Sequence, residues 1–261
     1  MISQITTVMF TNPKRISLPY NWIGHIPFVY DLVKEMKPQC IVELGTHTGN
    51  SFLAMCESVY DHNMQTSVYA VDTWRGEAHS GRYSGTVYDE LLSYTNKHYP
   101  FAKLLRKTFD EASRDFEPSN IDLLHIDGLH TYDAVRHDYE QWLPKMSDPS
   151  IMLFHDIAER RDDFGVYRLW EELKQKHEHT FEFTHNHGLG IVLIDTKNIR
   201  AELRDWLRQH AHPRGDYHVH GEWFWYQHAY QEMADILRAT RNSHAFKLGK
   251  FLLTPFRMIF K

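Results

Sequence analysis

The stretch CIVELGTHTGNS, residues 40–51, decides the fold. It opens with a short apolar run that is closed by Gly45, and residues 49–60 then carry apolar side chains at helical spacing. This order predicts a strand, a tight turn and a helix. Gly45 and Gly49 let a ligand come close to the backbone of the turn, where the start of a helix offers free N–H groups.

The same alternation continues along the chain. Further apolar runs at residues 67–72, 101–106, 121–126 and 151–154 alternate with helix-like segments, which predicts a mostly parallel sheet. After a helix-like segment at 164–177, two runs at 181–184 and 191–194 flank a glycine-containing loop and predict an antiparallel hairpin. We therefore expect an α/β, Rossmann-like fold with a seven-stranded sheet and helices on both faces, which is the layout of class I methyltransferases.

Composition narrows the class of protein. The chain has 261 residues, 42% of them hydrophobic, and a net charge of −5, so we expect a full core and no nucleic-acid partner. Cys40 and Cys56 lie in apolar runs, which predicts buried thiols in a reducing compartment. No run approaches the roughly 20 apolar residues of a membrane span, and no signal peptide is evident. We expect a cytoplasmic protein.

The last part of the chain differs from the rest. We expect one domain over residues 1–197 and a helical, His-rich extension over residues 198–261. Residues 236–261 contain six Lys or Arg and no acid, interleaved with Phe and Leu. This composition suits peripheral attachment to an anionic membrane at the inner face of the cytoplasmic membrane. A terminal helix docked on the protein itself or inside a homo-oligomer is the alternative.

Three aspartates close predicted strands. Asp72 lies 29 residues after Glu43, where an acidic residue can accept hydrogen bonds from a ribose. Asp127 and Asp156 end two later strands, and strand ends of an open α/β sheet converge on one crevice. Carboxylate oxygens suit a divalent ion such as Mg²⁺. Aspartates that merely cap turns are the alternative in each case.

A histidine near the same crevice completes the candidate chemistry. His130 follows Asp127 by three residues, and a neutral imidazole at that position is suited to general-base work. Because the chain contains 19 His, position alone distinguishes His130 from a surface or core histidine.

Taken together, residues 41–46, 69–74, 121–132 and 153–156 resemble the small class I methyltransferase family associated with bacterial glycosyltransferases and surface-polysaccharide clusters. The chain is more distantly similar to macrolide-sugar O-methyltransferases and cephalosporin-hydroxylase-type proteins. The resemblance covers roughly residues 18–195, and its most specific part is IDGLHTY at 126–132.

The resemblance implies a donor, a metal and an acceptor. S-adenosylmethionine is expected at a set of residues that comprises Glu43, Gly45, Thr46, Gly49, Ser51, Asp72, Thr73, Thr108, Phe109 and Asp127. A divalent metal is expected at Asp127, Asp156 and His155, with His130 and Asp127 as the catalytic pair. Where the macrolide and cephalosporin types tend to carry a second acidic residue, this chain has His155.

The expected reaction is methyl transfer to a sugar hydroxyl of a bacterial surface glycan or its lipid-linked precursor, with a glycosyltransferase as a possible partner. The enzyme's task is then to align the acceptor oxygen and remove its proton. In the polar loop 73–85, Trp74, Arg75 and Tyr83 are candidates for contact with the sugar. Two alternatives stay open: a nicotinamide-dependent oxidoreductase, and a catalytically idle glycan-binding or membrane-scaffold protein.

Overall fold

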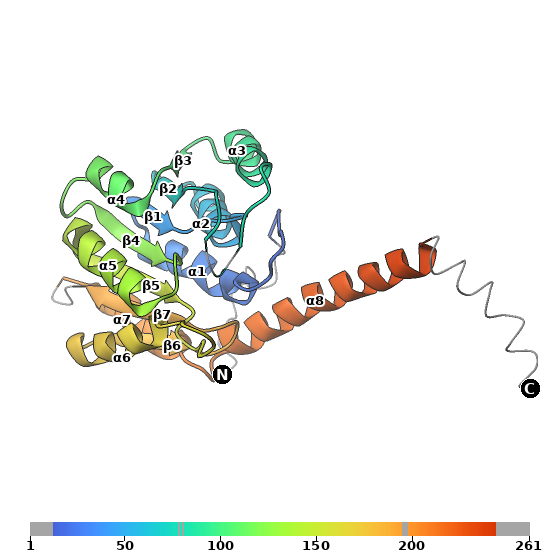
Figure 1. Ribbon diagram of the computed structural model, residues 1–261. Helices are drawn as coiled ribbons and strands as arrows, with labels where there is room; N and C mark the ends of the chain where they lie inside the picture. Colours follow the sequence, from blue (N-terminus) through green and yellow to red (C-terminus); the bar gives the residue numbers. More distant parts are fainter. Residues whose placement is uncertain (1–12, 78, 80, 195–197, 244–261) are drawn as a thin grey trace, which may run out of the picture.

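A seven-stranded sheet with helices on both faces forms the body of the protein (Figure 1). The computed structural model describes residues 13–77, 79, 81–194 and 198–243. The strand order is β3-β2-β1-β4-β5-β7-β6. In the described sheet β7 runs in the opposite direction to the other strands, so its pairings with β5 and β6 are antiparallel and the rest are parallel. The strands are β1 (Cys40–Leu44), β2 (Ser67–Asp72), β3 (Ala102–Arg106), β4 (Ile121–Ile126), β5 (Met146–His155), β6 (Thr180–Phe183) and β7 (Leu189–Ile194). The predicted fold class is confirmed.

The helices divide between two hydrophobic cores, one on each face of the sheet. The α-helices are α1 (Ile26–Met36), α2 (Asn50–Asp61), α3 (Val87–His98), α4 (Phe109–Ala112), α5 (Tyr132–Trp142), α6 (Val166–Lys176), α7 (Ala201–His210) and α8 (Asp216–Asn242), with short 3₁₀ helices η2 (Ile23–His25), η3 (Ser113–Asp115) and η4 (Leu143–Lys145). Neighbouring strand residues serve opposite cores: Ile41 packs with α1 and α2, whereas Val42 packs with α5 and α6. This alternation follows from the two-residue period of a strand.

Local capping fixes where two of the site's helices begin. The Thr131 hydroxyl accepts a hydrogen bond from the N–H of Ala134, so α5 starts directly after the loop that carries Asp127. Thr108 and Glu111 form a capping box at the start of α4. Such caps satisfy N–H groups that the helix itself leaves free.

Most predicted elements lie within a residue or two of their observed bounds. The main difference is β5, which begins at Met146 instead of residue 151. Met146 pairs with Ile121, and the register shifts before Ile151 pairs with Leu123. Polar residues and a proline fill the extra stretch, so no apolar run announces it in the sequence.

The chain after the sheet first packs on the body of the protein and then projects away from it. Leu207 of α7 and Tyr217 and Phe224 of α8 are buried in the same core as α1, so the start of the predicted extension packs on the body. The rest of α8 projects away from it (Figure 1). No described helix is long and apolar enough to cross a membrane. Residues 244–261, most of the predicted membrane-binding segment, lie outside the described residues.

Candidate active site

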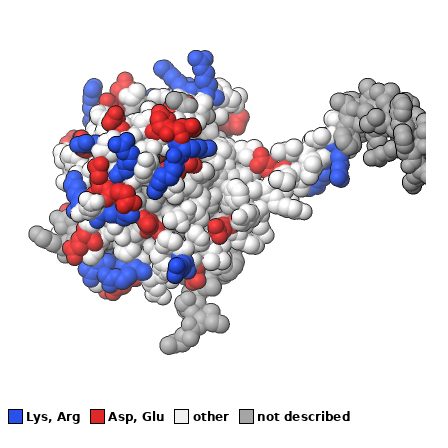
Figure 2. Space-filling view, turned by 60° about the horizontal axis from the view of Figure 1, so that its bottom comes forward, with Lys and Arg blue, Asp and Glu red and all other residues white. Residues whose placement is uncertain are grey.

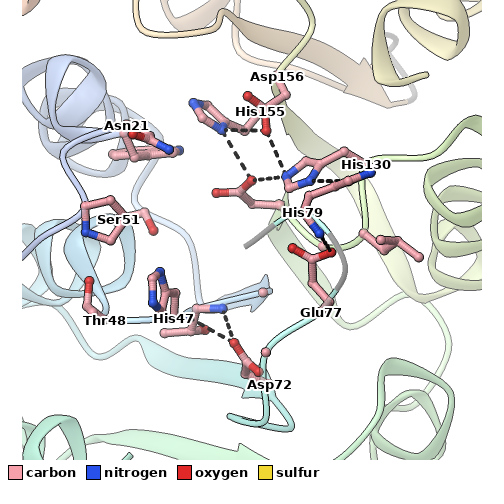
Figure 3. A pocket seen from close by; sticks show the side chains of 18 of the residues that line it. Asn21, His47, Thr48, Ser51, Asp72, Glu77, His79, His130, His155 and Asp156 are labelled. Carbon is pink, nitrogen blue, oxygen red and sulfur yellow. Dashed lines mark hydrogen bonds and ion pairs between the residues drawn. The ribbon is translucent and has the colours of Figure 1, made fainter. Parts of the chain in front are cut away.

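A cavity of about 720 Å³ opens at the carboxyl ends of β1, β2, β4 and β5 (Figure 3). Its walls come from loops far apart in the sequence, as expected for the crevice of an open α/β sheet. One side is formed by the turn between β1 and α2, and the other by the loops that follow β4 and β5. We call these the loop side and the carboxylate side.

The loop side is built around Gly45 and Gly49. Both residues have positive φ angles, +85° and +88°. A Cβ added to Gly45 would lie 2.0 Å from the carbonyl oxygen of Asp127, so only glycine fits where the two loops touch. Gly49 is the N-cap of α2 and turns the chain into the helix.

Asp72 holds this turn in shape. Its Oδ2 accepts hydrogen bonds from the backbone N–H groups of Thr46 and His47 at 3.1 and 3.0 Å, and its Oδ1 accepts one from the N–H of Trp74 at 2.6 Å. The carboxylate also lines the cavity, so it is positioned to meet a ligand. Thr46 adds a buried Oγ1 that has no partner among the described residues. Buried polar atoms are rarely left unpaired, so this hydroxyl is suited to a ligand contact.

The carboxylate side gathers Asp127, His130, His155 and Asp156. Figure 3 labels the two histidines and Asp156. The Nε2 of His130 lies 2.8 Å from Oδ2 of Asp156 and 3.5 Å from Oδ1 of Asp127. The Nδ1 of His155 lies 3.3 Å from Oδ1 of Asp127 and 3.4 Å from Oδ2 of Asp156. Asp156 has a φ of 62°, an uncommon conformation for a residue with a side chain. Strained backbone of this kind clusters at functional sites.

Charge balance explains how this cluster is stable. Burial alone would lower the pKa of His130, but its hydrogen bonds to both carboxylates outweigh burial and raise that pKa to about 9. The charges of the carboxylates likewise overcome burial and raise the pKa of His155 well above its usual value. In return, chiefly His155 keeps the pKa of the Asp127 and Asp156 carboxyls well below their ordinary range, against the effect of burial. At neutral pH two negative groups therefore face two positive ones.

Three of these residues have the geometry of a metal site. One ligand atom each from Asp127, His130 and Asp156 lie within 4.8 Å of one another. The sequence assigned His155 to the metal and His130 to proton transfer, whereas the geometry groups His130 with the carboxylates. The Nε2 of His155 lies 3.0 Å from the carbonyl oxygen of Asn186, which fixes that ring. To bind a metal or accept a proton, His130 must first lose its own proton.

Phe164 and His79 contact the ring of His130 and orient it. Its ring stacks on Phe164 with centroids 4.8 Å apart and an angle of 6° between the planes. Its Nδ1 lies 3.3 Å from Nδ1 of His79, and Nε2 of His79 lies 2.6 Å from Asp163. His79 belongs to the loop 73–85, so this loop reaches the carboxylate side of the cavity.

Glu43 is a predicted donor-binding residue that does not line the cavity. Its Oε1 lies 3.0 Å from Nδ1 of His125, and both side chains are completely buried. The indole N–H of Trp22 donates to the other ring nitrogen of His125 at 3.2 Å. Glu43 therefore supports the sheet beneath the site instead of lining it. Each of the two is a polar residue in an otherwise apolar strand, but only the register of β1 against β4 brings them together.

Of the remaining predicted site residues, all but Gly49 line the cavity. Its lining includes Gly45, Thr46, Ser51, Asp72, Thr73, Thr108, Phe109, Asp127, His130, His155 and Asp156. Among the loop residues, Tyr83 lines the cavity and stacks on His47 at 4.1 Å. Trp74 is buried in the core, and Arg75 is exposed outside the lining, so neither side chain lines the cavity. Contact of Arg75 with a sugar stays a prediction.

The N-terminal segment forms a wall that the sequence did not predict. The side chain of Asn50 donates to the carbonyl oxygens of Ser17 and Pro19, which fastens the segment to the start of α2. As a result, Asn21 and Trp22 line the cavity. Residues 18–22 include Tyr20 and Trp22, but their spacing does not predict contact with the start of α2.

Comparison with known proteins matches two stretches of this chain. A family model described as a methyltransferase domain matches residues 42–157. An uncharacterized protein of Sinorhizobium fredii, y4gI, is 43% identical over 171 residues, which are 66% of this chain and 19% of that protein. The chain thus spans about a fifth of the length of this curated relative.

Solved structures share the fold. The O-methyltransferase TomG from Streptomyces achromogenes, solved in complex with SAM, is similar with a TM-score of 0.50 and 11% identity, over 69% of this chain and 82% of that one. A Corynebacterium glutamicum protein is similar with a TM-score of 0.51 and 12% identity, over 68% of this chain and 82% of that one. At such low identity the likeness concerns the fold alone.

Proposed function

We propose that the protein is an S-adenosylmethionine-dependent, divalent-cation-assisted O-methyltransferase acting on a sugar hydroxyl of a bacterial surface glycan or its precursor. Residues 42–157 match the model of a methyltransferase domain, within a sheet of the class I methyltransferase layout. The observation that carries the proposal is the cluster of Asp127, His130 and Asp156, which shares one cavity with the glycine turn. A donor site next to a site for oxygen ligands is the arrangement that transfer to a hydroxyl requires.

The loop side fits the donor. The turn at Gly45 leaves the backbone open to close approach, and Asp72 is placed at the strand end where an acidic residue can accept hydrogen bonds from ribose. Phe109, which also lines the cavity, offers an aromatic face for adenine. The nicotinamide alternative loses its support, because the matched domain is that of a methyltransferase.

The carboxylate side fits a divalent cation. Two carboxylates suit Mg²⁺ or Mn²⁺, and an imidazole adds a nitrogen ligand. When bound, such a cation supplies Lewis-acid help in removing a proton from a hydroxyl. Asp127 and Asp156 hold the site, and His130, once neutral, is placed either to complete the ligand set or to accept the hydroxyl proton. Phe164 and His79 keep its ring in position for both roles.

His130→Ala separates these two roles. Loss of a positioned base lowers turnover by roughly 10²–10⁴-fold, and leaves cation affinity unchanged. Loss of a ligand weakens cation binding as well. Titration of Mn²⁺ into the wild-type protein and the variant, with turnover measured in parallel, therefore assigns the residue. Full activity in the variant would remove His130 from the reaction.

The proposed acceptor is tested with the glycan itself. Polysaccharide extracted from cells that lack the protein should accept a labelled methyl group from S-adenosylmethionine when Mg²⁺ is present, and lose most of the label when EDTA is added. Mass spectrometry of polysaccharide from cells with and without the protein should show the same methyl group. Methyl transfer that EDTA does not reduce would contradict the proposed need for a divalent cation. Absence of any transfer would contradict the glycan as the acceptor.

Attachment to the membrane stays a prediction from composition. A lipid-linked acceptor would make it useful, and the acid-free residues 236–261 are the proposed contact. Deletion of residues 246–261 should release the protein from vesicles containing phosphatidylglycerol without changing donor affinity. Vesicle binding that survives the deletion would contradict this role.

A further inference from the structure

α8 carries an apolar stripe that faces solvent. Its members are Val219, Trp223, Tyr226, Tyr230, Met233 and Leu237, and each is between 50% and 75% exposed. Successive members are four, three, four, three and four residues apart. This is the spacing of the a and d positions of a coiled coil, which repeat every 3.5 residues on average. We call this stripe the α8 seam.

The seam is separate from the face with which α8 packs on the body. Tyr217, Gly221 and Phe224 are buried, and the hydroxyl of Tyr217 donates to Asp31 at 2.6 Å. A Cβ on Gly221 would lie 2.1 Å from the carbonyl oxygen of Gly24, so the helix is closely docked there. The helix therefore has two apolar faces, of which the described residues cover only one. An exposed apolar patch of this length marks an interaction surface.

Charged residues of α8 avoid the seam and are divided along the helix. The described helix contains Asp216, Glu222, Glu232, Asp235, Arg238 and Arg241, and none of them falls on a seam position. All four acids precede both arginines. Figure 2 shows the projecting helix largely free of charged side chains, with acidic atoms nearer the body and basic atoms toward its outer end. When two such helices run in opposite directions about residue 228, Arg238 and Arg241 of one copy lie level with residues 218 and 215 of the other, beside Asp216. Their macrodipoles then also oppose.

We propose that the α8 seam is the interface of a homodimer in which two copies of α8 pair antiparallel. With the two-fold axis crossing the seam at the level of residue 228, Val219 of one copy faces Leu237 of the other. Trp223 then faces Met233, and Tyr226 faces Tyr230. Every seam residue has a partner, and each layer joins an a position with a d position. This self-complementarity is what a two-fold symmetric interface requires.

The alternatives fit the same observations less well. A parallel pair would place the acids of both copies side by side and would bring both bodies to the same end of the helices. In the antiparallel pair the bodies lie at opposite ends of a seam about 27 Å long, from a rise of 1.5 Å per residue. A helix lying on an anionic membrane is typically rich in Lys and Arg on its polar face, whereas this part of α8 holds four acids before residue 236.

Sedimentation equilibrium of the full-length protein tests the interface. The wild type should be a dimer at micromolar concentration. Tyr230→Glu, which buries two carboxylates in the seam, should weaken the dimer at least a hundredfold. Ala239→Glu adds the same charge to the exposed opposite face of the helix and should leave it unchanged. Circular dichroism confirms that both variants are folded. A monomeric wild type, or a dimer that survives Tyr230→Glu, would overturn the proposal.

Cysteine crosslinking tests the orientation. Cys40 and Cys56 are both buried and do not interfere. Val219→Cys and Leu237→Cys proteins should form a crosslinked dimer under mild oxidation when they are mixed, and neither should do so alone. A crosslink in the Leu237→Cys protein alone would show parallel helices. Binding of a monomeric wild type to phosphatidylglycerol vesicles, lost in Tyr230→Glu, would assign the seam to a membrane instead.

Discussion

The loop side and the carboxylate side face each other across one cavity but are ordered in different ways. On the loop side, backbone hydrogen bonds to Asp72 and a glycine contact at Gly45 fix the shape. On the carboxylate side, Asp127, His130 and Asp156 are fixed by their mutual charges. The loop side should therefore be sensitive to added volume and insensitive to ions. The carboxylate side should respond to charge, and changes on one side should leave the other intact.

The largest expected effect is on turnover. Asp127→Asn and Asp156→Asn keep the size of each side chain but remove a negative charge from the proposed cation site. Methyl transfer should fall by on the order of 10³-fold or more, because charge stabilisation in a largely buried site is a dominant part of catalysis. Steady-state rates over a range of Mg²⁺ concentrations provide the measurement, with Asp205→Asn on the exposed face of α7 as the control. Normal turnover in both active-site variants would refute the role of the carboxylates.

Gly45→Ala tests the loop side through volume. The new methyl group would overlap the carbonyl of Asp127, and the φ of +85° is strained for alanine. We expect a loss of about 2–4 kcal/mol in the free energy of unfolding. Gly85→Ala is a matched control, since a Cβ there meets no atom within 4 Å. Urea denaturation of the two variants measures the difference, and equal stability would show that the two loops do not touch as described.

Low pH should lower the stability of the fold through a buried histidine, His185. Burial lowers the pKa of His185 to about 4. Between the unfolded value near 6.5 and this one, the unfolded chain binds a proton that the folded chain does not, so stability falls as the pH falls. At pH 4 the free energy of unfolding is lower by about 3 kcal/mol on this account.

Urea denaturation at several pH values measures this dependence. His185→Gln should reduce the slope between pH 6.5 and pH 4, because one of two buried neighbouring histidines that must stay neutral is gone. Burial also lowers the pKa of His25 well below its usual value, so His25 keeps its share of the acid dependence. His137, exposed on α5, offers a control: His137→Gln should keep the wild-type dependence on acid in that interval much more closely. An unchanged slope in His185→Gln would assign the acid sensitivity to other groups.

The smallest effect is expected from Asp72→Ala. Removal of a charge-assisted hydrogen bond to ribose should weaken donor binding by about 1–3 kcal/mol. The affinity for Mn²⁺ should stay the same, because Asp72 belongs to the loop side. Calorimetric titration with the demethylated donor gives the first value and with Mn²⁺ the second. An unchanged donor affinity would remove Asp72 from the site.

The sequence predicted what depends on periodicity. Apolar runs gave the strands, and the rule that strand ends converge brought Asp72, Asp127 and Asp156 to one cavity. It could not predict contacts between distant side chains. Glu43 pairs with His125 across neighbouring strands, and Asn50 fastens the N-terminal wall, and neither follows from local spacing. The geometry groups His130, rather than His155, with Asp127 and Asp156, and no pattern in the sequence chooses between the two histidines.

The central claim is that the loop side alone binds the methyl donor while the carboxylate side serves the acceptor. Isothermal titration calorimetry with S-adenosylhomocysteine tests it most directly, using the wild type and Asp156→Asn, each with and without EDTA. The account predicts one donor site per chain with the same affinity in all four titrations, and no binding of NADH. Absence of S-adenosylhomocysteine binding, binding of NADH in its place, or donor affinity lost in Asp156→Asn would contradict it.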